Sequence, residues 1–153
     1  MADNELHFRR HAEKALYELT LSFPVILVTG PRQIGKTTLL QNSEKTGRMP
    51  YVSFDDTAEI NAVKADAKTF LSLHQSPIVF DEIQYVPELF PYLKMAADKN
   101  RKKGMYFLTG SQHFHLMKNV SESLAGRIGV LQLMGLSMRE TGGDKFDRSF
   151  IPT

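Results

Sequence analysis

The chain has 153 residues, which suits one domain that is large enough to bury a hydrophobic core. Its 42% hydrophobic and 24% charged residues are typical of a soluble globular protein, and a net charge of +2 gives no dominant basic field that would indicate nucleic-acid binding. Because the chain has no cysteine, disulfides, thiolate catalysis and cysteine-ligated metals are excluded.

Targeting signals are not apparent in the sequence. The N-terminal stretch MADNELHFRRHAEK lacks the apolar segment of a secretory signal. The longest apolar run, FPVILV, is too short to span a bilayer. We therefore expect a cytoplasmic protein without a membrane span.

Predicted strands and helices alternate along the chain. In chain order the patterns predict helix 5–20, strand 24–28, helix 36–43, strand 49–56, helix 58–74, strand 77–84, helix 87–103, strand 105–111, helix 113–126 and strand 127–137. This alternation favours an α/β domain with a largely parallel sheet. We expect the domain to cover residues 1–141, and the polar, aperiodic segment 142–153 to be a poorly ordered tail.

The stretch ILVTGPRQIGKTT places a glycine-rich turn between a predicted strand and a predicted helix, and it matches the phosphate-loop pattern G-x-x-x-x-G-K-[ST]. Glycine lets backbone N–H groups turn toward a phosphate at close approach. Lys36 would place its charge on the β- and γ-phosphates, and Thr37 would offer a hydroxyl oxygen to Mg²⁺. The predicted phosphate loop consists of Gly30, Pro31, Arg32, Gln33, Ile34, Gly35, Lys36 and Thr37. Arg32 either reaches a phosphate or is solvated, and Thr38 caps or packs.

The third predicted strand, PIVFDEIQ, ends in two carboxylates. Asp81 follows three apolar strand residues, the Walker B arrangement, in which the carboxylate holds Mg²⁺ through its water shell. Glu82 comes next, where a carboxylate can act as the base that deprotonates the attacking water. Such a base would waste ATP in a small-molecule kinase, so Glu82 favours an ATPase.

Two further candidates follow from the ends of the later strands. Ser111 and Gln112 end the fourth strand, where they either hydrogen-bond the γ-phosphate or the attacking water, or cap the next helix. Arg127 precedes the fifth strand and is either an arginine finger for a neighbouring subunit or a surface arginine.

Other polar residues have less specific interpretations. Asp55 and Asp56 either contact metal-bound water or cap the next helix, and the cap is favoured slightly. His113 and His115 lie two apart, which places them on different faces of a helix and gives little support to a zinc site. The basic cluster is interpreted mainly as a solvated helix end, with a nucleic-acid contact as the alternative; it consists of Lys99, Arg101, Lys102 and Lys103.

The ordered set FPVILVTGPRQIGKTTLL, YVSFDD, PIVFDEIQ, YFLTGSQ and SLAGRIGVLQLMGLSMRE resembles the N-terminal domain of a family of prokaryotic AAA-type ATPases, which are akin to the archaeal ATPases. The similarity runs from about Phe8 to Glu140. It implies a three-layer α/β P-loop NTPase domain of the ASCE type, with a mostly parallel five-stranded sheet in the order 5-1-4-3-2. Members of this family have a separate C-terminal domain, so we expect this chain to be the nucleotide-binding part alone.

The resemblance also implies roles for individual residues. It places Gly30, Gly35, Lys36, Thr37 and Thr38 at the nucleotide. It implies that Asp81 binds the magnesium ion, that Glu82 is the base and that Ser111 is a sensor residue. It favours Arg127 as an arginine finger that acts in trans within a homo-oligomer.

The leading functional hypothesis is a Mg²⁺-dependent ATPase whose turnover drives a conformational change. The alternative is an interaction module that binds ATP and scarcely hydrolyses it. Glu82 favours the first, whereas the missing C-terminal part favours the second. A GTPase is disfavoured because the Asn-Lys-x-Asp guanine signature is absent from the sequence.

Overall fold

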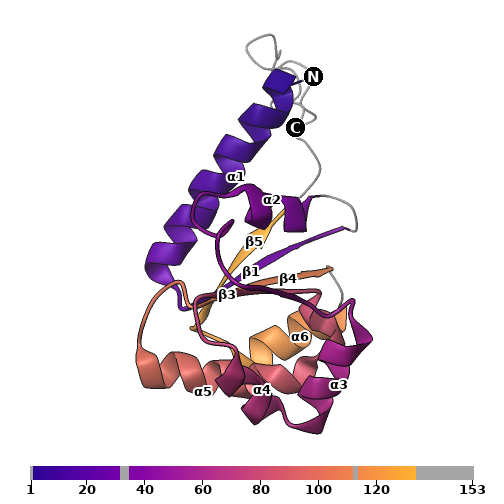
Figure 1. Ribbon diagram of the computed structural model, residues 1–153. Coiled ribbons are helices and arrows are strands. Elements are labelled where there is room, and N and C mark those ends of the chain that lie inside the picture. The colour runs from indigo at the N-terminus through magenta and orange to yellow at the C-terminus, as the bar shows by residue number, and fades with distance from the viewer. Residues whose placement is uncertain (1, 32–34, 112–113, 134–153) are drawn as a thin grey trace.

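The computed structural model describes residues 2–31, 35–111 and 114–133. A five-stranded sheet with every pairing parallel forms its centre, in the order β2-β3-β4-β1-β5 (Figure 1). The strands are β1 (Val25–Gly30), β2 (Tyr51–Ser53), β3 (Ile78–Asp81), β4 (Tyr106–Ser111) and β5 (Ile128–Gln132). This order confirms the expected 5-1-4-3-2 arrangement, read from the opposite edge.

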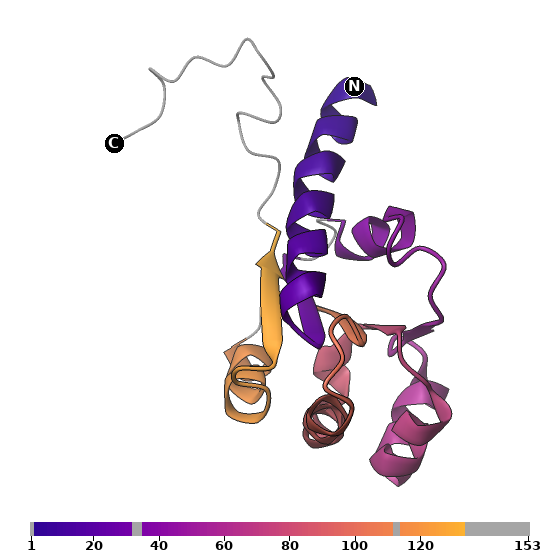
Figure 2. The same ribbon diagram turned by 90° about the vertical axis from the view of Figure 1, so that its left-hand side faces the viewer.

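Helices cover both faces of the sheet, which makes a three-layer fold (Figures 1 and 2). The helices are α1 (Ala2–Ser22), α2 (Lys36–Asn42), α3 (Thr57–Ala65), α4 (Ala67–Leu73), α5 (Phe90–Asn100) and α6 (Phe114–Ser123), with 3₁₀ turns η1 (Ile83–Tyr85) and η2 (Pro87–Leu89). None of these helices, within the part of the chain that the structure describes, is long and apolar enough to cross a membrane.

The alternation of side chains along the central strand builds two separate cores. On β1, Val25 and Leu27 pack into the core under α3 to α6, whereas Ile26 and Val28 pack into the core under α1 and α2. Successive side chains of a strand point to opposite faces, so a strand covered on both faces needs an unbroken apolar run. The sequence VILV meets that need, and all four side chains are fully buried.

Several predicted boundaries were wrong. The helix predicted over 58–74 is two helices, because the Asp66 side chain accepts a hydrogen bond from the backbone N–H of Thr69 at 3.0 Å and so caps α4. The helix predicted over 87–103 begins as α5 only at Phe90, after η2, and the strand predicted over 49–56 is shortened to Tyr51–Ser53. Part of the fifth predicted strand and the predicted tail 142–153 lie outside the described residues.

Candidate nucleotide site

The predicted phosphate loop leaves the carboxyl end of the central strand β1 and leads into α2. Gly30 ends β1, and Lys36 begins α2 directly after Gly35. Gly35 has a φ of 96°, a left-handed conformation that residues with a Cβ rarely adopt. The loop residues Arg32, Gln33 and Ile34 lie outside the described part of the chain.

Lys36 is buried and turned back over the loop. Its side chain is only 6% exposed. Its ammonium group donates hydrogen bonds to the carbonyl oxygens of Gly30 at 2.8 Å and Pro31 at 2.9 Å. The positive charge therefore lies at the loop and at the electropositive N-terminus of α2, a location that suits an anionic ligand.

Asp81, at the carboxyl end of β3, is bound by hydroxyl groups from three elements. Thr37 of α2 donates to its Oδ1 at 2.9 Å, and Thr109 of β4 donates to the same oxygen. Tyr51 of β2 donates to its Oδ2 at 2.5 Å, with the Ser53 hydroxyl 3.4 Å from that oxygen. Both oxygens of this buried carboxylate are therefore engaged.

Tyr51 is held in its neutral, donating form. Partial burial raises the pKa of its phenol well above the usual value, and the hydrogen bond to Asp81 and the charge of that carboxylate raise the pKa further. The phenol therefore keeps its proton and donates a hydrogen bond to Asp81 throughout the physiological pH range.

The donor set beside the loop fits a magnesium ion. Mg²⁺ prefers oxygen ligands and is usually held by one or two protein groups together with substrate phosphates. Thr37 and Asp81 supply a hydroxyl and a carboxylate whose oxygens lie 2.9 Å apart, and Thr37 directly follows the buried Lys36 in the chain. Because the Thr37 hydroxyl donates a hydrogen bond to Asp81, its oxygen lone pairs remain free to bind a metal.

Glu82 occupies a strained backbone conformation directly after Asp81. Its φ of 59° and ψ of 50° are left-handed, which is uncommon for a residue with a side chain and is often found at functional sites. Its backbone N–H donates to the Thr109 hydroxyl at 3.0 Å. Its carboxylate accepts a hydrogen bond from the side-chain amide of Gln84 in η1.

Gln84 lies against β4 as well as against Glu82. Its amide oxygen is buried and makes no hydrogen bond to the described residues. A Cβ added at Gly110 would lie 3.2 Å from that oxygen and 2.5 Å from Cδ2 of Leu116. Glycine at position 110 therefore permits β4, η1 and α6 to approach one another beside the candidate base.

Ser111 lies at the same edge of the sheet as the phosphate loop. It ends β4 and pairs in register with Gly30, the last residue of β1. Its position is compatible with a sensor role, which stays a prediction. Gln112 and His113 lie outside the described residues.

Arg127 lies at the amino-terminal end of the parallel strands, whereas the phosphate loop lies at their carboxyl end. The carbonyl oxygen of Arg127 accepts a hydrogen bond from the N–H of Val25, the first residue of β1, whereas the loop follows the last residue of β1. Its guanidinium donates to both carboxylate oxygens of Asp98, at 2.6 and 3.1 Å, and to the carbonyl of Ala125 at 2.8 Å. The hydrogen bond from Arg127 holds the pKa of Asp98 below its usual value. A role at the nucleotide of its own subunit is excluded by this placement, and a role in trans stays a prediction.

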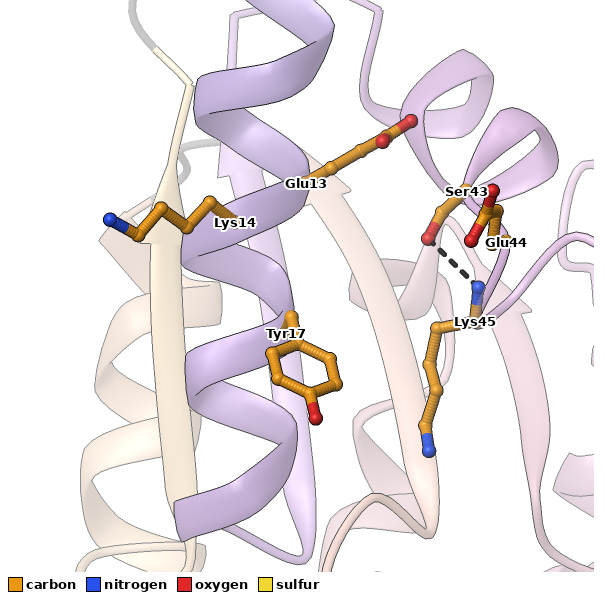
Figure 3. A pocket seen from close by; sticks show the side chains of 6 residues that line it. All are labelled: Glu13, Lys14, Tyr17, Ser43, Glu44 and Lys45. Atoms are coloured by element: carbon orange, nitrogen blue, oxygen red, sulfur yellow. Dashed lines mark hydrogen bonds between the residues drawn. The ribbon is translucent and has the colours of Figure 1, made fainter.

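Pockets are also present away from the phosphate loop. One, of about 420 Å³, contains Asp98 and Arg127 and is bordered by Arg101, Lys102 and Lys103 of the predicted basic cluster. Another, of about 470 Å³, lies between α1 and the segment after α2 (Figure 3); its lining residues are Glu13, Lys14, Tyr17, Ser43, Glu44 and Lys45. Ser43 is the C-terminal cap of α2, so this pocket lies at the other end of that helix from Lys36.

Of the less specific candidates, the aspartates after β2 are the clearest. Asp56 is the N-terminal cap of α3, since its side chain accepts from the N–H of Ala58 at 2.9 Å. This confirms capping for Asp56. Asp55 is exposed and follows the same strand.

Sequence reasoning missed the polar groups that hold the two carboxylates. Thr109 reaches Asp81 because β3 and β4 are neighbours, with Phe80 opposite Leu108. That signal becomes visible only once the strand order is assigned. Tyr51 and Gln84 belong to no motif, and the 3₁₀ turn that brings Gln84 back to Glu82 has no periodic signature.

Comparison with known proteins supports this assignment of the fold. A family model described as an AAA domain matches residues 22–142. Two curated relatives, the uncharacterized proteins Rv2008c of Mycobacterium tuberculosis and Mb2031c of Mycobacterium bovis, are each 37% identical over 144 residues, or 94% of this chain. The chain spans 32% of the length of each relative.

The fold is also similar to that of a solved structure. A crystal structure of a DNA replication initiation factor superposes with a TM-score of 0.53 at 19% identity, over 87% of this chain and 46% of that chain. At this identity the likeness concerns the fold alone. The family match over most of the chain, together with the loop and the strand order, shows that this chain belongs to the AAA domain family of P-loop ATPases.

Proposed function

We propose that this chain is a magnesium-dependent ATP-binding and ATP-hydrolysing core, whose turnover drives a conformational change. The observation that carries the proposal is the 2.9 Å hydrogen bond between Thr37 and Asp81. It joins the start of α2, with the buried ammonium of Lys36, to the end of β3, where Glu82 follows. Residues suited to bind phosphate, to bind metal and to activate water therefore belong to neighbouring segments at the carboxyl end of the strands.

Each residue of the site has a separate role in the proposed reaction. When nucleotide binds, the ammonium group of Lys36 would exchange its hydrogen bonds to the loop carbonyls for hydrogen bonds to phosphate oxygens. Thr37 and Asp81 would hold magnesium, which would supply positive charge beside the phosphates. Glu82 would accept a proton from water as that water attacks the γ-phosphorus. The bond between this phosphorus and the β–γ bridging oxygen breaks, and ADP and inorganic phosphate leave.

A module that binds ATP with little turnover is the second candidate. It is favoured by the hydrogen bond from Gln84 to the Glu82 carboxylate, because the amide donor competes with the attacking water for that carboxylate. The same contact would let a partner control hydrolysis by moving Gln84.

The test is the Mg²⁺-ATP hydrolysis rate as a function of protein concentration, with Glu82→Gln as the matched variant. An ATPase predicts turnover that falls at least a hundredfold in this variant while nucleotide binding persists. Lys36→Ala serves as the control that lowers binding itself. Binding without any Glu82-dependent turnover, at all concentrations, would overturn the ATPase assignment and favour the switch module.

A further inference from the structure

The carboxylate of Asp81 is held by more groups than the phosphate-loop motif accounts for. Thr37 belongs to that motif, and Thr109 comes from the neighbouring strand β4. The remaining two hydroxyls, of Tyr51 and Ser53, come from β2, a three-residue strand at the edge of the sheet.

The register explains how a residue at the start of β2 reaches the end of β3. Tyr51 pairs with Val79, two residues before Asp81. Two strand residues span about 6.6 Å, a distance that a tyrosine side chain laid along the strand can cover. Ser53 pairs directly with Asp81, but its hydroxyl lies farther from the carboxylate, at 3.4 Å, than that of Tyr51, at 2.5 Å.

The two oxygens of Asp81 are divided between different partners. Oδ1 accepts from Thr37 and Thr109 on the side of the phosphate loop, and Oδ2 accepts from Tyr51 and Ser53 on the side of the sheet edge. A carboxylate can rotate about its terminal bond, since that torsion is broad. The contact from Tyr51 restrains this rotation and so helps to set the plane of the carboxylate relative to Thr37.

We propose that Tyr51 is a positioning residue for magnesium, which orients the carboxylate of Asp81 through its hydroxyl. This inference rests on the proposed function, in which Asp81 and Thr37 hold the ion. Groups that orient a metal-binding carboxylate typically change metal affinity 10- to 100-fold when they are removed. Because Asp81 would act through the water shell, we expect an effect of about tenfold, at the lower end of that range.

Tyr51→Phe removes this hydroxyl and little else. The side chain is 40% exposed, so the loss of one oxygen leaves no cavity in a core. The ring borders a pocket of about 220 Å³ formed with Leu40, Thr46 and Val79, which gives phenylalanine the same room. Tyr17→Phe is the matched control, because Tyr17 is an exposed tyrosine on α1.

The experiment measures binding of a fluorescent ADP analogue (mant-ADP) to the full chain across a Mg²⁺ titration and again in EDTA. For Tyr51→Phe we expect the half-saturating Mg²⁺ concentration to rise about tenfold, with unchanged affinity in EDTA. The protein should still fold, with a lower melting temperature because one hydrogen bond to the Asp81 carboxylate is lost. Ser53→Ala should shift it in the same direction by less. Tyr17→Phe should leave both affinities as they are.

Each contrary outcome has a distinct meaning. A Mg²⁺ dependence that stays within twofold of the unmodified protein, with nucleotide still bound, overturns the positioning role of Tyr51. An equal loss of affinity with and without Mg²⁺, or a variant that does not fold, shows that Tyr51 supports the loop or the fold in general and also overturns it. If the unmodified protein binds no mant-ADP, the proposed function itself fails.

Discussion

The hydroxyl of Thr109 lies between the two carboxylate residues at the end of β3: it accepts from the backbone N–H of Glu82 at 3.0 Å and donates to the side chain of Asp81. One oxygen atom of β4 thereby contacts both the backbone of the candidate base and the carboxylate of the candidate metal ligand. Because both of its hydrogen-bonding functions are used, no other residue type except serine can replace it without loss.

Thr109→Val should destabilise the protein by about 1–3 kcal/mol, because it leaves the Glu82 N–H and one Asp81 contact unsatisfied beside a fully buried side chain. Urea denaturation, followed by circular dichroism, measures this change. Thr109→Ser keeps the hydroxyl and is the control, which should recover most of the loss. A Thr109→Val protein as stable as the unmodified one would contradict the role of the hydroxyl, and equal destabilisation by both variants would show that the methyl group contributes as much as the hydroxyl.

Gly110→Ala should cost about 1–3 kcal/mol, since its Cβ would lie 2.5 Å from Cδ2 of Leu116. The shortest contact is with the Leu116 side chain, so Gly110→Ala and Leu116→Ala should be non-additive: the double variant should lose less stability than the sum of the single variants. Thermal unfolding of the four proteins gives the comparison. Strict additivity would contradict this account of the contact.

Asp66 should make stability depend on pH. The hydroxyl and N–H of Thr69 lower the pKa of this cap, so the folded protein favours the ionised form. The contribution is present above the ordinary carboxyl pKa and is lost as the pH falls through the lower folded value. Asp66→Asn keeps an acceptor but cannot titrate, so the stability difference between it and the unmodified protein should shrink from pH 7 to pH 3.

Guanidinium denaturation at a series of pH values measures this difference. Asp66→Ala is the companion variant, because it removes both the acceptor and the charge and should be less stable than Asp66→Asn at pH 7. A constant difference between Asp66→Asn and the unmodified protein across the whole range would contradict the lowered pKa.

Arg127→Ala should retain ATP binding and lose turnover about a thousandfold, if the arginine completes the site of a neighbouring subunit. Asp98→Asn is the control: it removes the ion pair that holds Arg127 in place but keeps the guanidinium. It should therefore impair turnover far less than Arg127→Ala. Parallel loss of binding and turnover in Arg127→Ala would contradict the finger assignment.

Much of the fold could be predicted because the sequence patterns depend on burial alone. A continuous apolar run such as VILV has no stable place except between two covered faces, and each parallel strand then needs a crossover helix. Element boundaries were less predictable. Asp66 interrupts an otherwise helical pattern by capping a second helix, and a local hydrogen bond of this kind competes with helix continuation without changing the apolar spacing.

The residues of the candidate site also differ in how far the sequence predicts them. Lys36, Thr37 and Asp81 were predictable since their spacing is fixed by the loop and the strand end. Tyr51 and Thr109 were not, because their contacts depend on which strands are neighbours and on the register between them. Such information belongs to the folded sheet and is absent from any short stretch of the chain.

Arg127 and the phosphate loop lie at opposite ends of the parallel strands, so the candidate finger and the candidate nucleotide site are on different surfaces of the molecule. If one copy supplies this arginine to another, the contact joins two different surfaces, so subunits add head to tail. An open row of such copies always ends in one site without an arginine, and only a closed ring completes them all. Turnover per subunit would then report the stoichiometry and closure of the assembly.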